Sequence, residues 1–433
     1  MKKAILLFIL VLFCFSIAEA QYRKAYILSE GGFSAGSSKL SLYNITANTF
    51  TLSIFSPGSL GLFPDGLVYN NGFLYLLEQG SYGGQGKIYK LDSNGTVLSS
   101  FSFGTNPYSL AISNNKVYTT NGPSGKVIVL NLTNFSVVKE INSGVYPQEI
   151  IAFRNYVFAC NTSIFGGNQD STVSVINVFN DSLITKINVM KDPSSLAITN
   201  DSNLLIGCPG SGGKIYKVNP NTFSVIQTYT LSSGFDRDMS VDKFTGNVYY
   251  INYNNGISRL NLSNGQVNDI INNSNPAGIY YYGYNYDYYA NKHYLLDAKN
   301  FTVSGSLNIF NSSGNLEQTF ATGIAPRRIV FGNPGTTSVQ PISEAISDYS
   351  LEQNYPNPFN QSSVINYKCQ ISGFVKIVLF DLTGKEIKTL INEYKQPGTY
   401  KVRFNAEGLS GGIYFYKMTA GDFSDVKKII LLK

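Results

Sequence analysis

The chain has 433 residues and a formal net charge of +6, with 14% charged and 14% aromatic residues. So few charges argue against a Lys/Glu-rich helical protein, whereas 31 Tyr, 28 Phe and 40 Gly favour an all-β fold with many turns. The single histidine, His293, rules out sites built from several histidines. We expect no bound metal and no cofactor.

Residues 1–20 read as a signal peptide. Lys2 and Lys3 precede an apolar or small stretch over residues 4–18, and Ala18 and Ala20 are the small residues that a signal peptidase reads. A retained membrane anchor is the alternative, but the stretch is short for a span of about 20 residues. We therefore expect secretion, with the mature chain beginning at Gln21.

Three cysteines follow the leader. An odd number does not form a complete disulfide framework, and we expect all three to be small buried side chains. Cys160 and Cys208 fall at similar places on successive repeats, so we predict that they do not pair. The three are Cys160, Cys208 and Cys369.

A short motif recurs through the first three quarters of the chain: Pro or Asp, two further residues, then apolar residues. Steps of 43, 40, 46, 43, 40 and 50 residues separate its copies, which is the period of a four-stranded propeller blade. Within one period, residues 193–235 predict four strands separated by turns. The copies start at Pro64, Pro107, Pro147, Pro193, Asp236, Pro276 and Pro326.

The two ends of this region complete each other. Residues 25–55 hold three strands without an inner strand, and residues 326–332 form an inner strand with no blade after it. Joined, they make one blade and leave no open edge in the ring. The sequence therefore predicts an all-β, seven-bladed β-propeller over residues 21–332, with 328–331 as the closing inner strand.

The blade pattern resembles the YVTN-type and NHL-like propeller families. The copy closest to the repeat pattern of these families begins at Pro193 and reads PSSLAITNDSNLLIGCPGSGGKIYKVNPNTFSVIQTYTL. A WD-repeat protein is excluded because the chain has no Trp. The resemblance indicates the fold and says little about function.

Residues 333–350 are small and polar with two prolines, which predicts a linker. Residues 351–433 then alternate apolar and polar over six or seven short strands, which predicts a small C-terminal β-sandwich. A generic carbohydrate-binding or fibronectin-like sandwich is the alternative interpretation of this segment.

The C-terminal segment resembles the type A C-terminal sorting domain of the type IX secretion system of Bacteroidetes-like bacteria. It carries QNYPNPFN at 353–360, VLFDLTGKEIKTL at 378–390, PGTYKVRFNAEGLSGGIYFYKM at 397–418 and a terminal DVKKIILLK. Only Gln361, where many members have Pro, departs. The resemblance implies that residues 351–433 engage the type IX translocon and its sorting peptidase, and that the protein reaches the cell surface or the medium.

Charge limits the partners of the propeller. Residues 21–350 carry 20 basic and 19 acidic side chains, so the basic stripe of a nucleic-acid-binding protein is missing. We expect no nucleic-acid partner, a monomer, and an unknown surface or extracellular ligand.

Propeller ligands usually bind where the loops between blades, and between second and third strands, meet at the channel. The longest such loops are residues 78–86 and 161–171, with residues 234–238 between blades. Aligning second strands on Tyr75, Tyr118, Phe158, Ile206, Tyr250 and Tyr294 adds one rim position: Glu78, Asn121, Asn161, Pro209, Tyr253 and Asp297. The candidate binding residues are Glu78, Tyr82, Asn121, Phe165, Phe235, Arg237, Asp238, Tyr253 and Asp297.

Two classes of function remain open. The first is a surface-displayed binding or interaction propeller. The second is a secreted lyase or glycosidase acting through Glu78, Asp297, Asp236 or Asp238, in which Glu78 and Asp297 form an acid/base pair. The tyrosine run over residues 280–289 is either a sugar-stacking platform or a strand packed between blades. We favour binding without catalysis, because lyase-type propellers lean on histidine and only His293 is present.

Overall fold

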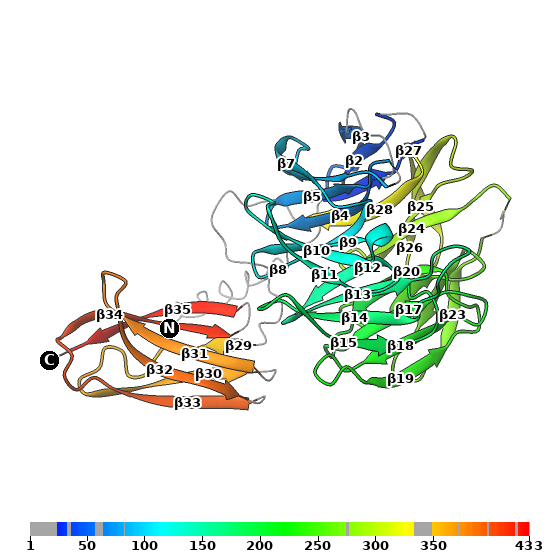
Figure 1. Ribbon diagram of the computed structural model, residues 1–433. Coiled ribbons are helices and arrows are strands. Elements are labelled where there is room, and N and C mark those ends of the chain that lie inside the picture. Colours follow the sequence, from blue (N-terminus) through cyan, green and yellow to red (C-terminus); the bar gives the residue numbers. More distant parts are fainter. Residues whose placement is uncertain are drawn as a thin grey trace, which may run out of the picture. The chain divides into compact units, whose positions relative to one another are not determined.

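The computed structural model describes residues 24–32, 36–56, 64–81, 83–273, 277–332, 349–369, 373–395, 398–420 and 423–432. Apart from one short 3-10 helix (Gly122–Ser124), their regular secondary structure is β-strand, and they form two compact units, a propeller and a C-terminal sandwich (Figure 1). No helix among them is long and apolar enough to cross a membrane. The predicted leader lies outside the described residues.

The propeller consists of seven four-stranded antiparallel sheets, numbered here as blades in chain order. Blade 1 contains β28 (Pro326–Gly332), β1 (Lys24–Ser29), β2 (Lys39–Asn44) and β3 (Thr49–Phe55). Blades 2 to 4 are β4 (Pro64–Asn70), β5 (Phe73–Glu78), β6 (Gly86–Leu91), β7 (Val97–Phe103); β8 (Pro107–Ser113), β9 (Lys116–Asn121), β10 (Lys126–Asn131), β11 (Val137–Asn142); and β12 (Tyr146–Phe153), β13 (Tyr156–Thr162), β14 (Thr172–Asn177), β15 (Ser182–Asn188). Blades 5 to 7 are β16 (Ser195–Ile198), β17 (Leu204–Cys208), β18 (Lys214–Val218), β19 (Val225–Thr230); β20 (Arg237–Val241), β21 (Val248–Ile251), β22 (Ile257–Leu260), β23 (Val267–Ile271); and β24 (Tyr281–Asp287), β25 (Lys292–Asp297), β26 (Ser304–Asn311), β27 (Leu316–Ile324).

The ring closes as the sequence predicts. Strand β28 pairs with β1, Lys24 lying opposite Gly332 and Ile27 opposite Ile329. The inner strands also follow one another around the channel, with β28 beside both β24 and β4, and β4 beside β8. The predicted fold class, an all-β seven-bladed propeller followed by a small sandwich, is confirmed.

Adjacent blades are held together by apolar side chains. Between blades 2 and 3, Tyr75 and Ile88 pack with Leu110, Val117 and Ile128 in one buried cluster. Second strands such as β5 and β17 are buried almost throughout, whereas outer strands such as β11 are mostly exposed. Burial is therefore greatest at second strands such as these and least at the outer edge of a blade.

A bulge begins most inner strands. In blade 2, Pro64 pairs with Glu78 but Leu67 pairs with Leu76, so the inner strand holds one extra residue between these pairs. The same irregularity falls between Pro107 and Leu110. A bulge breaks the alternation of side chains and re-aims them. It is why two successive residues of one blade can both reach into the channel.

The motif placed at Pro276 is wrong by five residues. Residues 274–276 lie outside the described residues, and the inner strand of blade 7 is β24, whose Tyr281 faces Asp297 as Pro64 faces Glu78. From 236 to 281 and from 281 to 326 both steps are 45 residues. Blade 7 has Tyr281 where most blades have Pro, so the start of this copy could not be recognised from the motif. The tyrosine run is this inner strand, with Tyr284 and Tyr286 buried between blades.

The three described cysteines, Cys160, Cys208 and Cys369, are buried and form no disulfide, as the sequence predicts.

The C-terminal unit is a two-sheet sandwich. One sheet holds β29 (Tyr349–Leu351), β30 (Ser362–Cys369) and β33 (Gly398–Asn405), and the other β32 (Glu386–Lys395), β31 (Gly373–Phe380), β34 (Gly412–Ala420) and β35 (Phe423–Leu431). Its core joins Ile365 and Tyr367 to Ile377, Tyr416 and Ile429. Strand β29 begins two residues before the expected boundary at 351.

The QNYPNPFN segment is built into this sandwich. The Asn354 side-chain amide donates to the Pro356 carbonyl at 3.0 Å and to Ser363 Oγ at 2.8 Å, and Tyr416 Oη donates to the Glu352 carbonyl at 2.7 Å. The ring of Phe359 is buried in the core. The motif is therefore structural, as it ties the start of the unit to both of its sheets.

Candidate ligand-binding site

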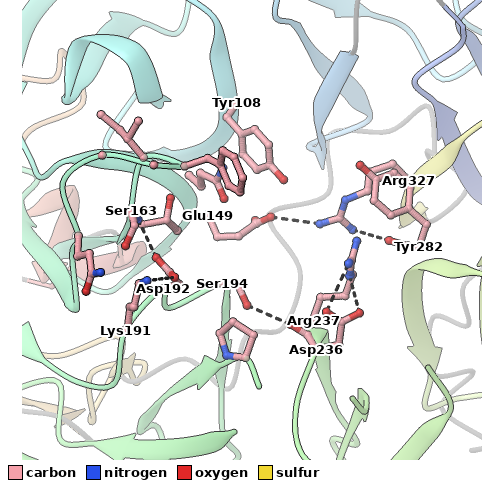
Figure 2. A pocket seen from close by; sticks show the side chains of 18 residues that line it. Tyr108, Glu149, Ser163, Lys191, Asp192, Ser194, Asp236, Arg237, Tyr282 and Arg327 are labelled. Atoms are coloured by element: carbon pink, nitrogen blue, oxygen red, sulfur yellow. Dashed lines mark hydrogen bonds and ion pairs between the residues drawn. The ribbon is translucent and has the colours of Figure 1, made fainter. Parts of the chain in front are cut away.

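A cavity of about 740 Å³ opens at the end of the channel where the inner strands begin (Figure 2). Its floor is formed by the residue that follows the first residue of the repeat motif, contributed by six of the seven blades. These six residues are Tyr108, Gln148, Ser194, Arg237, Tyr282 and Arg327. Loop 162–169 and residues 191–192 rise around this floor as a wall.

Beneath the floor lies a cluster of buried ion pairs. Arg327, whose side chain is 4% exposed, reaches Asp238 at 2.9 Å and Glu149 at 3.5 Å. Its neighbour Arg328 reaches Asp65 at 2.7 Å and also bonds to Glu149. The two cations come from β28 alone, whereas the three carboxylates come from blades 2, 4 and 6. We call these five residues the ionic cluster.

The ionic cluster lies between two cavities. A second cavity of about 340 Å³ lies among the inner strands, and both Glu149 and Arg327 line it as well as the first. We call the first cavity the cup.

Desolvation sets the electrostatics around the cluster. Burial opposes the charge on Arg327, but Asp238 and the other nearby acids outweigh it and raise its pKa. Burial also raises the pKa of Glu149, against the lowering effect of Arg328 and Arg327. Glu30, which accepts a bond from Tyr282 Oη at 3.0 Å, has its pKa raised to about 8 by burial and by Asp65. The attraction within each ion pair offsets the desolvation cost of these buried charges, and the pairing fixes their geometry.

One wall of the cup is loop 162–169. Ser163 donates its backbone N–H to Asp192 Oδ1 at 2.7 Å, and Asp170 accepts the backbone N–H of Val145 at 2.9 Å. At the tip, Gly167 donates to the Ile164 carbonyl, and Gly166 has a φ of 69°. That is the pattern of a type II turn, which requires a residue such as Gly at this place. The turn holds Phe165 fully in solvent at the rim.

Part of the floor is a stack of planar groups. Arg237 binds both oxygens of Asp236, at 3.0 and 3.3 Å, and donates to Tyr280 Oη at 2.7 Å. Its guanidinium also lies over the ring of Tyr282, 5.1 Å from the ring centre. Four contacts thus hold the Arg237 guanidinium, of which Figure 2 shows those to Asp236.

The cup brings together some of the residues named from the sequence. Phe165 and Arg237 line it, and Asp238 lies below them in the ionic cluster. Tyr253 is 57% exposed and is not among the lining residues, and Phe235 is buried under Gly207 against the ring of Tyr250. Tyr82 lies outside the described residues.

The rim position holds buried structural side chains. Asn121 Oδ1 accepts the backbone N–H of Thr105, and Asp297 Oδ1 accepts those of Tyr280 and Lys299. Glu78 accepts a bond from Tyr89 Oη at 3.0 Å, and burial raises its pKa to about 7. None of these three lines the cup.

The second-strand alignment is one residue off in blades 5 and 6. Leu196 pairs with Ile206 as Leu67 pairs with Leu76, which makes Cys208 the equivalent of Glu78. In blade 6, Met239 pairs with Tyr250 in the same way, so the equivalent of Glu78 is Asn252 and not Tyr253. Pro209 and Tyr253 therefore follow the rim position.

The sequence interpretation missed Glu149, Asp192, Tyr108 and Arg327 as site residues. Three of them occupy the two places that follow the first motif residue, which the repeat search treated as unrestricted. A comparison of those two places across the copies would have found them. No group of three or more His, Cys, Asp or Glu side chains able to hold a metal occurs in the part of the chain that the structure describes.

Comparison with known families places both units. Residues 353–432 match the model of the secretion system C-terminal sorting domain, so the chain is a β-propeller protein that carries an export signal of the type IX system to the cell surface or extracellular space. Residues 24–245 match the model described as a domain of unknown function, DUF5074, and the chain belongs to this family. The matching model is thus not a YVTN or NHL one, and that resemblance stays one of blade pattern.

Among the solved structures compared, one supports the fold, and the fold alone. A quinonprotein alcohol dehydrogenase-like protein from Bacteroides thetaiotaomicron is 14% identical, with a TM-score of 0.57 over 72% of this chain and 78% of its own. Hydrazine synthase from Kuenenia stuttgartiensis is 14% identical (TM-score 0.49, 60% of this chain and 87% of its own). The β-propeller domain of Cps50 (Swd1) from Myceliophteria thermophila is 12% identical (TM-score 0.46, 59% and 86%). No curated protein matches the chain.

Proposed function

We propose that this protein is a secreted or surface-displayed binding module, and that the cup at the channel mouth is its ligand site. The observation that carries the proposal is the cup itself: a cavity of about 740 Å³ with an exposed aromatic side chain at its rim and polar groups from six blades. Small-molecule sites have about this volume and this convergence of polar groups.

Export supports the same interpretation. The signal peptide would bring the chain to the periplasm, and the sorting domain would then engage the type IX translocon and its sorting peptidase. A module that acts outside the cell meets its ligand there. The cup would bind its ligand there whether the mature protein is released or attached at the surface.

No specific observation favours the enzymatic alternative. Of the four carboxylates named for it, Asp236 binds Arg237 and Asp238 binds Arg327, while Glu78 and Asp297 are buried in different blades. We therefore propose binding as the activity.

The test is a binding screen of the purified full-length chain against soluble oligosaccharides, peptides and metal ions. We expect a ligand whose affinity falls in Phe165→Ala, since Phe165 is exposed and its loss leaves the fold intact. A screen without any ligand, or a ligand that binds Phe165→Ala unchanged, would contradict the proposal.

A further inference from the structure

We propose that the ligand of the cup is a neutral oligosaccharide, whose pyranose ring stacks on Phe165 while its hydroxyl groups bond to the polar floor and walls. This inference rests on the proposed function and names the class of ligand for the same site. It follows from three independent features of the cup: the pairing of its charges, its unused polar atoms and the position of its one exposed ring.

The charges of the cup neutralise each other. Among the lining residues, Glu149, Asp192 and Asp236 are acidic, and Lys191, Arg237 and Arg327 are basic. Each acid has a basic partner within 4 Å: Glu149 has Arg327 at 3.5 Å, Asp192 has Lys191 at 3.8 Å and Asp236 has Arg237 at 3.0 Å. No pair leaves an excess charge to attract a charged ligand. The cup therefore favours a ligand without net charge.

The paired groups still have atoms to offer. In the described part of the chain, the bonds of Arg237 use Nε and Nη2, which leaves the two hydrogens of Nη1 for a ligand. The side-chain amides of Gln148 and Gln169 also line the cup and have no hydrogen-bond partner among the described residues. Carboxylates keep further lone pairs after one or two bonds. The cavity thus presents both donors and acceptors.

Sugar hydroxyls match this arrangement. Each hydroxyl group both donates and accepts, so adjacent hydroxyls can bond at once to a carboxylate and to a guanidinium or amide edge. The planar pair Asp236–Arg237 offers an acceptor side and a donor side next to each other. A ligand that only donates or only accepts would leave half of these atoms unsatisfied, which costs free energy in a recessed site.

Phe165 supplies the apolar contact. Its ring is fully exposed, although an isolated chain gains nothing from holding a phenyl group in water. The type II turn and the bond from Ser163 to Asp192 keep it at the rim of the cup. The C–H face of a pyranose is flat and apolar, and stacking on Phe165 would bury both surfaces while the hydroxyl edges turn toward the floor.

The experiment is isothermal titration of the purified full-length chain with neutral trisaccharides (maltotriose, cellotriose, xylotriose and mannotriose), with trigalacturonate as the anionic probe and triglycine as the peptide probe. We expect at least one neutral trisaccharide to bind, and its affinity to be nearly the same at low and high salt because no net charge is recognised. Phe165→Ala should weaken binding by about tenfold, a loss typical of an aromatic contact.

Two further variants locate the site. Gln169→Ala removes an exposed amide of the cup, and we expect it also to weaken the neutral sugar. The control is Phe244→Ala: Phe244 is 60% exposed but lines a different cavity, with Asn200 and Lys217. This variant should bind as the wild type does.

The outcomes separate the inference from the proposed function. In one outcome no neutral trisaccharide binds, but trigalacturonate or triglycine binds to the wild type and not to Phe165→Ala. The inference of a neutral oligosaccharide is then overturned, and the cup remains a binding site. If a neutral sugar binds equally to wild type, Phe165→Ala and Gln169→Ala, the cup is not the site and both are overturned.

Discussion

Arg327 of the closing strand pairs with Asp238 of β20 at 2.9 Å, although a whole blade, built on β24, stands between their strands in the ring. The contact passes in front of that blade, where Arg327 Nη1 also donates to the Tyr282 carbonyl at 3.1 Å. Ring closure thus involves the side chains that meet inside the channel as well as the pairing of β28 with β1.

Asp238→Asn should strongly destabilise the propeller. The substitution leaves the buried Arg327 guanidinium without its closest carboxylate, and removing one partner of a buried pair costs about 3 to 5 kcal/mol. The control is Asp201→Asn, whose carboxylate is 58% exposed in its pair with Lys217 and should cost at most about 1 kcal/mol. Urea unfolding measures both, and equal losses would show that the ionic cluster contributes no more than a surface pair.

Glu78→Gln should change how stability depends on pH. Burial raises the pKa of Glu78 from 4.5 to about 7, so between these values the folded chain holds a proton that the unfolded chain has lost. This group therefore makes the wild type less stable as pH rises through that window, by up to about 3 kcal/mol, and Gln removes the effect.

We expect the free energy of unfolding of Glu78→Gln, relative to wild type, to increase from about pH 5 to about pH 8. Glu140→Gln is the control, because Glu140 is exposed in its pair with Lys126. A Glu78→Gln curve parallel to the wild-type curve would contradict the raised pKa.

Phe165 and Phe235 should respond differently to the same substitution, although both were named from the sequence as contact residues. Phe235 is fully buried against Tyr250, and Phe235→Ala should cost about 3 to 5 kcal/mol. Phe165→Ala should change stability by less than about 0.5 kcal/mol because its ring is in solvent. Thermal unfolding compares the two, and a large loss in Phe165→Ala would mean that the ring has a structural role.

Removal of residues 351–433 should block export and leave the propeller folded. All seven sheets are formed by strands within residues 24–332, and the matched sorting domain spans residues 353–432. Fractionation of a host with type IX secretion should find the truncated chain in the periplasm, with an unfolding transition like that of the full propeller. Its appearance at the cell surface would refute the role of the sorting domain.

Cys160, Cys208 and Cys369 should all titrate as thiols when the unreduced protein is unfolded. In the folded protein the reaction should be slow, since burial raises the pKa of Cys208 to about 12 and the thiolate is the reactive form. A linked Cys160–Cys208 peptide in mass spectrometry would contradict the arrangement of blades 4 and 5.

The blade period could be predicted from the sequence because each inner strand starts with a recognisable residue, and it failed at Tyr281, where that residue is missing. The register of second strands was harder. Strands β17 and β21 are buried along their whole length, so apolar residues do not alternate and a slip of one residue leaves no trace in the pattern. The loop over residues 161–171 was named from the sequence because of its length, and part of it lines the cup.

The pairing within the ionic cluster could not be predicted from the sequence, although its members occupy the two places that follow the first motif residue. Arg328 and Asp65 lie 263 positions apart, and Arg328 and Glu149 lie 179 apart. Only the closed ring brings them into one channel. The pairing of charges in the cup has the same origin, and so it could be described only once the blades were placed.

The order of segments links ring closure to the sorting domain. The strand that completes blade 1 begins at Pro326, and the residues that match the sorting domain begin only after it, at 353. Synthesis that stops before residue 326 leaves blade 1 without its inner strand and the chain without the sorting domain. A translation product that includes the sorting domain therefore also includes the strand that closes the ring.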